Sequence, residues 1–341
     1  MPNTPERTIG DIVDLASAYY GSAILFAAIE LDLFSAVEQQ QPEATQQKLA
    51  AATGGNERAL RLLLDGCVAT GLLRKDGNSY SNTPAGQAAL IDHAPHDLRG
   101  AIRYNQDVYP AWGKLVDFVR TGAPVDAPEI HLGDDPERTR RFALSMHGRA
   151  LGIGRAVVPM LPLQGCRRLL DLAGGPGTYA SLMAQAHPEL RCVTMDLPAI
   201  SAVASELVAQ AGLADRVLCQ PGNYHTDTYE PEAFDAVTIF GALHQEAPEM
   251  IVSILKRAAT ALKPGGTIMI LDMMTDATHT QPPFSALFAV NMALTTYNGW
   301  VFADTELHGW LEEAGFTHCT TQPVPPPMPH WLVTATKAIL S

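Results

Sequence analysis

A glycine-rich segment followed by an acidic residue predicts a binding site for a ligand that contains adenosine. The segment LLDLAGGPGTYA begins at Leu169, and Gly175, Gly177 and Ala180 match the pattern Gly-x-Gly-x-x-(Gly/Ala). Asp196 follows about 20 residues later, the spacing at which an acid accepts hydrogen bonds from ribose hydroxyls. Glycines let the backbone approach a ligand closely, so the two features together indicate a nucleoside site.

An acid inside the first strand argues against a nicotinamide dinucleotide. Asp171 lies four residues before Gly175. A dinucleotide site has an apolar residue there, because its pyrophosphate needs a helix N-terminus free of nearby anions. A ligand with a cationic sulfonium and an amino acid tail is compatible with a carboxylate at this position. The pattern therefore favours a sulfonium-bearing adenosine compound.

One histidine provides a candidate general base. His244 follows the predicted strand 234–243, at the edge where sheets of this kind bind ligands. A phenol has a pKa of about 10, so a base that takes its proton near neutral pH would assist group transfer to the oxygen. A hydrogen-bonded histidine of the core is the alternative interpretation of this residue.

The elements that must position these residues form an α/β pattern in the second half of the chain. Helices such as 248–262 separate apolar runs that predict strands at 166–173, 191–197, 216–222, 234–243, 266–274 and 330–337. Repeated strand–helix units predict a doubly wound, Rossmann-like, mainly parallel sheet.

The first half of the chain is predicted to be almost entirely helical. Thr45 and Gly54 mark the start and end of a short helix, a longer helix follows, and a hairpin turns at Asp76-Gly77. This order is typical of a winged helix. The second helix has Arg58 and Arg61 as its cations, which favours packing or dimerisation over reading a DNA groove. A winged-helix regulator is the alternative.

Composition and charge restrict the class of protein. The 341 residues are 47% hydrophobic and carry a formal net charge of −13, which disfavours nucleic acid as a partner. Five scattered cysteines without a C-x-x-C pair predict reduced thiols, with no disulfide and no metal site. The apolar segment 18–37 is interrupted by Glu30 and Asp32, which indicates a buried helix rather than a membrane span. We expect this helix to pack on another copy of the chain, with a place at the centre of its own domain as the alternative. With no signal peptide at the N-terminus, we expect a cytoplasmic protein.

These motifs, in this order, resemble those of S-adenosylmethionine-dependent methyltransferases. LLDLAGGPG resembles the first motif of that superfamily, MDLP its second, and LKPGG the turn before its fifth strand. With the winged-helix half added, residues 12 to 338 resemble the dimeric small-molecule O-methyltransferases, a family of plant caffeate-type, acetylserotonin and bacterial natural-product enzymes. The resemblance implies a homodimer whose chain has a dimerisation domain at 1–100, a helical linker to the acceptor pocket at 101–160, and a catalytic domain at 161–341.

The resemblance also implies S-adenosyl-L-methionine as cofactor and S-adenosyl-L-homocysteine as product. Asp196 would bind the ribose hydroxyls, with a helix N-cap as its alternative role, and Asn223 would accept from the adenine amine where the family has an aspartate. The predicted cofactor-binding residues are Asp171, Gly174, Gly175, Gly177, Asp196, Leu197, Asn223, Tyr224, Phe240 and Gly241.

The implied acceptor is a hydroxyl of a hydrophobic, aromatic or polycyclic small molecule from secondary metabolism. His244 matches the general base of the family. Residues of two predicted helices would form the acceptor pocket, with ordinary core packing as their alternative role; they are Phe142, Met146, His147, Phe288, Asn291 and Met292.

The chain departs from the family pattern beside its candidate base. The usual His-Asp-Trp is His244-Gln245-Glu246 here, so the tryptophan that covers adenine is absent, and Val301 stands where plant members have a glutamate that orients the histidine. Asp272 and Glu246 are the candidates for that orienting role. The departures leave open C- or N-methylation, and also a homologue that binds the cofactor without transferring a methyl group.

Overall fold

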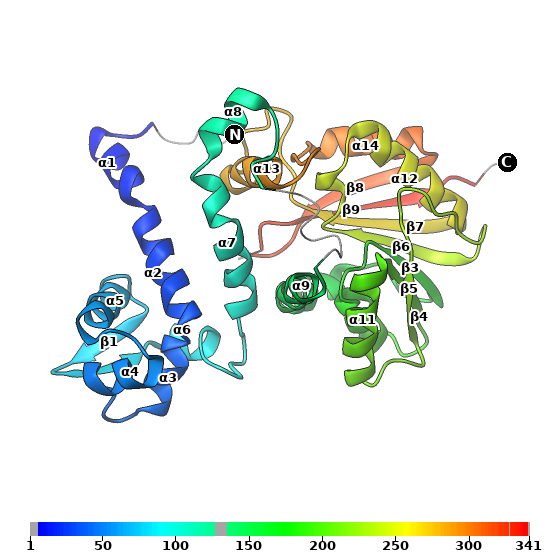
Figure 1. Ribbon diagram of the computed structural model, residues 1–341. Helices are drawn as coiled ribbons and strands as arrows, with labels where there is room; N and C mark the ends of the chain where they lie inside the picture. Colours follow the sequence, from blue (N-terminus) through cyan, green and yellow to red (C-terminus); the bar gives the residue numbers. More distant parts are fainter. Residues whose placement is uncertain (1–5, 127–134, 327, 340–341) are drawn as a thin grey trace. The chain divides into compact units, whose positions relative to one another are not determined.

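The computed structural model describes residues 6–126, 135–326 and 328–339, and the chain divides into two compact units, Met1–Gln106 and Asp107–Ser341 (Figure 1). The first unit contains helices and one short hairpin. Its elements are α1 (Ile9–Ser17), α2 (Tyr19–Glu30), α3 (Leu33–Gln39), α4 (Gln46–Thr53), α5 (Glu57–Ala69), β1 (Leu73–Asp76), β2 (Ser79–Asn82), α6 (Pro84–Ala89) and the start of α7 (Arg99–Trp112).

The predicted helix–turn–helix–hairpin order is confirmed in this unit. The Thr45 side chain accepts from the backbone of Lys48 at the start of α4, and Gly54 ends that helix with φ +67°. Strands β1 and β2 pair antiparallel around Gly77, whose φ is +56°. Tyr80 and Phe34 are fully buried in the core that these helices share with the hairpin.

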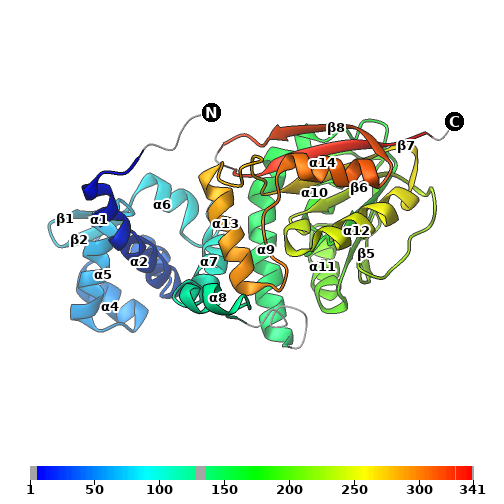
Figure 2. The ribbon, with the colours of Figure 1, turned by 90° about the horizontal axis from the view of Figure 1, so that it is seen from above.

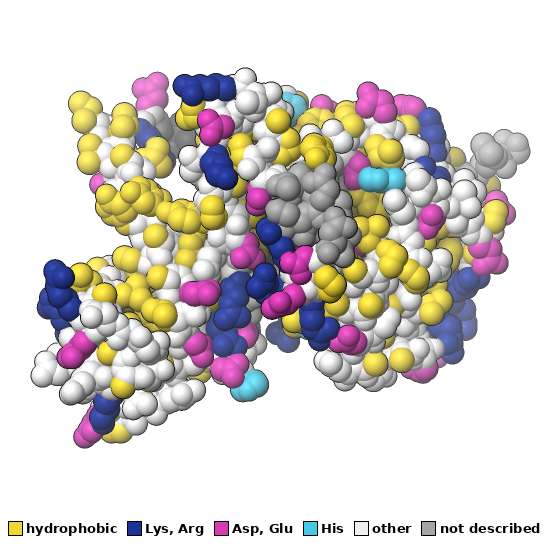
Figure 3. Space-filling model, viewed as in Figure 1, with side chains coloured by type: hydrophobic (Ala, Val, Ile, Leu, Met, Phe, Trp, Pro, Cys, Tyr) yellow, Lys and Arg dark blue, Asp and Glu magenta, His cyan; other side chains and the backbone are white. Residues whose placement is uncertain are grey.

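Helices α1 and α2 leave apolar side chains uncovered, and Figure 3 shows hydrophobic surface gathered along them. Ile9 is 84% exposed, and Ile12, Val13, Leu15 and Tyr20 are all more than half exposed. Among the described residues, Ile9–Glu30 is also the one helical stretch long and apolar enough to cross a membrane, judged by length and composition alone. An uncovered apolar surface of this kind marks an interaction site.

The second unit is built on one seven-stranded sheet. Its helices are the end of α7, α8 (Leu115–Thr121), α9 (Pro136–Val157), η2 (Val158–Met160), α10 (Thr178–Ala186), α11 (Pro198–Gln210), η3 (Leu243–Gln245), α12 (Pro248–Ala261), α13 (Pro283–Thr295) and α14 (Asp304–Glu313). The strands are β3 (Arg168–Leu172), β4 (Arg191–Asp196), β5 (Val217–Pro221), β6 (Phe234–Phe240), β7 (Leu262–Asp272), β8 (Phe316–Pro323) and β9 (Trp331–Lys337).

The strand order is β5-β4-β3-β6-β7-β9-β8, with β3 to β7 parallel and β9 antiparallel to both of its neighbours. The predicted doubly wound sheet is therefore confirmed. Strand β8 was not predicted. Most of its residues are at least partly exposed, and its threonines resemble those of a polar connecting segment. Strand β7 begins at Leu262, before the expected turn, and its register against β6 shifts between Phe234 and Ala236.

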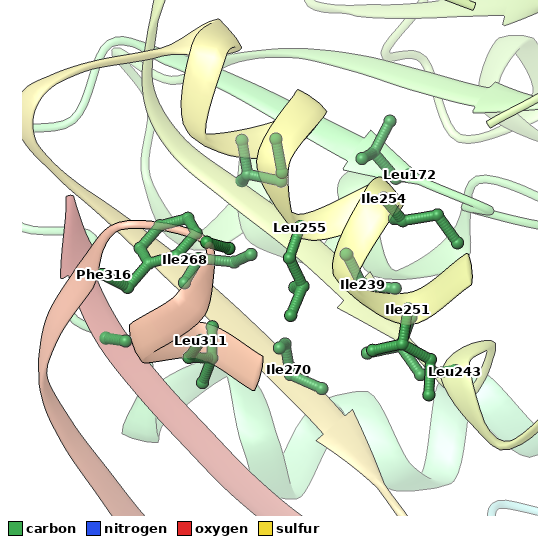
Figure 4. Close-up of a cluster of buried hydrophobic side chains, with 14 of the residues drawn as sticks. Leu172, Ile239, Leu243, Ile251, Ile254, Leu255, Ile268, Ile270, Leu311 and Phe316 are labelled. Atoms are coloured by element: carbon green, nitrogen blue, oxygen red, sulfur yellow. The ribbon is translucent and has the colours of Figure 1, made fainter. Parts of the chain in front are cut away.

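Helices cover both faces of the sheet (Figure 2). Along β6, Val237 and Ile239 pack in a cluster with α12 and α14, whereas Ala236 and Phe240 pack in a cluster with α9 and α10. Figure 4 shows the first of these clusters, with Leu255 between the sheet and the helices. Successive side chains of a strand point to opposite faces of the sheet, so the continuous apolar run of β6 contributes to the core on each face. This packing holds the carboxyl ends of the strands in place.

Candidate active site

The glycine loop between β3 and α10 is shaped for close contact with a ligand. Gly175 and Gly177 have φ values of +55° and +69°, which other residues rarely adopt. A Cβ on Gly174 would lie 1.9 Å from Thr194 Oγ1 and 2.4 Å from Asp171 Oδ2, so no larger residue fits there. A Cβ on Gly175 would meet nothing within 4 Å, and the loop therefore leaves open space on that side.

Asp196 ends β4 and is tied to this loop. Its Oδ2 accepts from the Gly175 amide at 2.8 Å, and its Oδ1 accepts from the Leu197 amide at 2.8 Å. Burial raises the pKa of this carboxyl, and the two amides oppose that shift. Helix α11 begins at Pro198 with Leu197 as N-cap and no side-chain capping bond, so the N-cap interpretation of Asp196 is wrong. Each oxygen retains a lone pair, as a ribose contact requires.

Asp171 lies beneath the loop, inside the sheet. It is fully buried and accepts from Thr238 Oγ1 at 2.7 Å and from Thr194 Oγ1 at 3.1 Å. Burial raises the pKa of this carboxyl to about 6, although the two hydroxyls oppose the shift. The Asp171 carboxyl lies directly against the position of Gly174 and so supports the glycine loop.

The Asp171→Asn variant is expected to show a weaker dependence of stability on pH. The folded carboxyl has a pKa of about 6 against a usual 3.8, so its contribution is present at low pH and is lost as the pH rises between those values. The amide stays neutral and avoids that loss, of which roughly 2 kcal/mol falls between about pH 4.5 and about pH 7.5. Thermal unfolding of the cofactor-free proteins at about pH 4.5 and about pH 7.5 measures the difference. If the wild-type protein and the variant lose the same stability between these two pH values, the raised pKa does not belong to Asp171.

His244 and Asp272 form a buried pair where β6 and β7 end. His244 lies in η3, and its Nδ1 is 2.5 Å from Asp272 Oδ1. The same carboxylate accepts from the backbone amides of His244 and Met273, at 3.3 and 2.8 Å. A carboxylate at Nδ1 selects the tautomer with the proton on that nitrogen, which leaves Nε2 with a lone pair. This arrangement can remove a proton from a bound hydroxyl.

Comparison with known proteins decides the family. A family model described as an O-methyltransferase domain matches residues 121–317, and one described as an O-methyltransferase dimerisation domain matches residues 13–92. The tetracenomycin polyketide synthesis 8-O-methyl transferase of Streptomyces glaucescens is 31% identical over 331 residues, with 96% of each chain covered. The chain belongs to the O-methyltransferase family.

Other matches extend along the whole chain. The L-tyrosine C(3)-methyltransferase of Streptomyces lavendulae is 28% identical over 345 residues, covering 96% of this chain and 93% of the relative. Human N-acetylserotonin methyltransferase in complex with S-adenosylmethionine has the same fold, with a TM-score of 0.88 at 23% identity, covering 99% of this chain and 100% of that one. Members of this family use S-adenosylmethionine, so the predicted cofactor of this O-methyltransferase is confirmed.

The loop after β5, where Asn223 is the predicted adenine contact, is held by hydrogen bonds of its own. The Asn223 amide oxygen accepts from the His225 backbone at 2.9 Å, and the Asn223 backbone donates to Asp227 Oδ2 at 2.9 Å. One lone pair of the amide is therefore used within the loop. Tyr224 donates to Glu246 Oε1 at 2.6 Å, which ties this loop to the one after β6.

The end of β6 faces the same edge of the sheet. Phe240 meets the ring of Tyr179 edge-on at 5.1 Å. Gly241 has φ +69°, and a Cβ there would meet nothing within 4 Å. Together with the glycine loop, these residues fit an adenosine-bearing cofactor laid across the carboxyl ends of β3, β4 and β6.

Three of the predicted acceptor residues lie in α13 of this O-methyltransferase. Phe288 meets the His244 ring edge-on at 5.3 Å, and Met292 packs with Phe288, Met273 and Val301. The Asn291 amide oxygen accepts from Trp112 Nε1 at 2.9 Å. The candidate base is thus bordered by an apolar wall with one buried amide.

The other three predicted acceptor residues lie in α9, and the contacts of two of them are with α11 and α10. Phe142 packs against Ile200 and Val203 of α11. His147 Nδ1 lies 2.8 Å from Thr178 Oγ1 at the start of α10, where it lines a small cavity of about 80 Å³ between α9, α10 and α11. Met146 is half-buried in the same helix. The helical spacing placed all three residues within two turns of one another. It did not show which helix each face of α9 packs against.

The structure adds two residues that the sequence did not indicate. Trp112, in α7, donates to Asn291 as described. His330, just before β9, is buried, and its Nδ1 has no hydrogen-bond partner among the described residues. Burial lowers its pKa to about 4, and the charge of Arg149 adds to that shift. Neither residue belongs to a spaced motif, so tertiary contacts alone reveal them.

Proposed function

We propose that His244 is the general base for methylation of a hydroxyl on a hydrophobic, aromatic or polycyclic acceptor. The observation that supports this most directly is the buried pairing of His244 Nδ1 with Asp272 Oδ1. The paired carboxylate orients the ring and stabilises the imidazolium that forms when Nε2 takes the hydroxyl proton. The apolar wall of Phe288, Met273 and Met292 matches an aromatic acceptor.

S-adenosylmethionine supplies a methyl group on a positively charged sulfur, an electrophile whose leaving group needs no assistance. The chain's task is to align the acceptor and to exclude water. Asp196 and the glycine loop would hold the adenosine and methionine parts, and Asp171 would add a negative charge beneath them. His244 then raises the nucleophilicity of the acceptor oxygen at neutral pH.

The test is product analysis with a panel of phenols, naphthols and polycyclic hydroxyl compounds. Each is incubated with the enzyme and S-adenosylmethionine, and S-adenosylhomocysteine and the methylated product are assigned by mass spectrometry and NMR. A methyl group on oxygen supports the proposal. A methyl group on carbon, as the name of the L-tyrosine C(3)-methyltransferase relative suggests for that protein, or on nitrogen would replace it. Cofactor binding with no turnover on any acceptor would favour a non-methylating role.

We infer further that two copies associate in the cytoplasm through the exposed apolar residues of α1 and α2, most of which lie within the matched dimerisation domain at residues 13–92. Light scattering is expected to give twice the 36.6 kDa of one chain. The Leu15→Glu variant should shift the mass toward one chain, because a charge would be buried in the interface. Val119→Glu, at an exposed position of α8, is the matched control. A single-chain mass for the wild-type protein refutes the dimer.

A further inference from the structure

A buried carboxylate near the active site has no role in the chemistry described so far. Glu246, two residues after the candidate base, is 6% exposed. By sequence Glu246 is a candidate partner for His244, but Asp272 occupies the Nδ1 side of that ring. Glu246 instead accepts from the Tyr224 hydroxyl at 2.6 Å and lies 2.8 Å from His225 Nε2, with both contacts on Oε1.

These contacts join two loops of the sheet's carboxyl edge. Tyr224 and His225 belong to the loop after β5, and their rings meet edge-on at 4.6 Å. Glu246 belongs to the loop after β6, and its carbonyl accepts from Trp300 Nε1 at 2.9 Å. The Tyr224 carbonyl accepts from Arg257 of α12 at 2.6 Å, so the β5 loop is held from two directions.

The β5 loop borders the ribose-binding carboxylate. The Gly222 amide donates to the Asp196 carbonyl at 2.9 Å, and Asn223 and Tyr224 follow directly. Burial raises the pKa of Tyr224 well above its usual range, and the charges of Glu246 and Asp196 add to the shift. Asp196 ends β4, which lies between β3 with its glycine loop and β5, so a ribose held there with the methionine part toward the glycine loop would have its base toward β5. The loop that Glu246 holds is therefore the wall on the base side of the cofactor.

We propose that Glu246 is a positioning residue that fixes the adenine side of the cofactor site through Tyr224 and His225. The inference rests on the assigned cofactor and is independent of the acceptor and of His244. A glutamate suits this role because one carboxylate oxygen can accept from both side chains at once. Both donors are only partly exposed, so removing their acceptor leaves them without this partner and releases the loop.

The test compares Glu246→Ala with Glu246→Gln in the full chain by calorimetric titration with S-adenosylmethionine and S-adenosylhomocysteine, without acceptor. We expect the alanine variant to raise Kd for both compounds about 10-fold, because the partly buried Tyr224 and His225 side chains lose their shared acceptor. The glutamine variant retains an acceptor oxygen and should recover most of that loss. Glu249→Gln, at an exposed position three residues further along, is the matched control and should bind as the wild type does.

A second variant guards against loss of folding. Tyr224→Phe removes only the hydroxyl. In the Glu246→Ala background this change should raise Kd by a smaller factor than it does in the wild-type protein, since both changes break the same contact. In steady-state assays, KM for S-adenosylmethionine should rise while kcat at saturating cofactor stays within about twofold. An unchanged Kd in the alanine variant, or a change confined to KM for the acceptor, would overturn the proposal. Both binding results stand whether or not His244 acts as a base.

Discussion

Replacing His244 with glutamine is expected to lower kcat by about 100- to 10,000-fold while Kd for S-adenosylmethionine stays close to the wild-type value. The imidazole is buried beside Phe288 and is positioned for proton transfer by Asp272. Glutamine can still donate to the carboxylate but cannot accept a proton at neutral pH. The loss should therefore appear in turnover with the identified phenolic acceptor, and calorimetry should show normal cofactor binding.

The pH profile separates a missing base from general damage to the site. The acceptor phenol ionises by itself near its own pKa of about 10 and then needs no base. Activity of the His244→Gln variant should consequently rise with pH and approach that of the wild type at high pH. His308→Gln, in α14 and hydrogen-bonded to Thr321, serves as the matched control and should keep wild-type activity. Turnover of His244→Gln at the parental rate at pH 7 would remove the base assignment.

The Asp272→Asn variant is expected to lose activity by about 100-fold or more, because it disturbs the tautomer of His244. Asp272 accepts three hydrogen bonds, from His244 Nδ1 and from the amides of His244 and Met273. An asparagine has one acceptor oxygen and must turn its NH₂ toward one of these donors. If the NH₂ faces Nδ1, the imidazole proton moves to Nε2, which then cannot act as a base.

The measurement is kcat and both KM values of Asp272→Asn across pH. The loss should fall on kcat, and it should diminish at high pH as for His244→Gln. The double variant should be little worse than His244→Gln alone, because the two residues act as one unit. Asp276→Asn, in the loop that follows β7, is the matched control. If the fold-losses in kcat of the two single variants multiply in the double variant, Asp272 acts independently of the base.

The sequence by itself determined the features that are local along the chain. The glycine loop, the acid at Asp196 and the histidine after β6 are each recognised within one strand–loop–helix segment, since spacing and residue type suffice. The parallel sheet followed from repeated apolar runs for the same reason. The edge strand β8 could not be predicted from the sequence, because its exposed threonines form no apolar pattern.

Only the tertiary structure decided which acid serves which partner. Asp272 and Glu246 were equal candidates in the sequence, and Asp272 lies 28 residues from His244. The parallel register of β6 with β7, which pairs Phe240 with Leu271, brings Asp272 to the histidine, whereas Glu246 points toward the β5 loop. Likewise, α9 directs Phe142 and His147 toward α11 and α10. Strand register and helix rotation are set by packing between distant segments, so no local pattern could reveal these contacts.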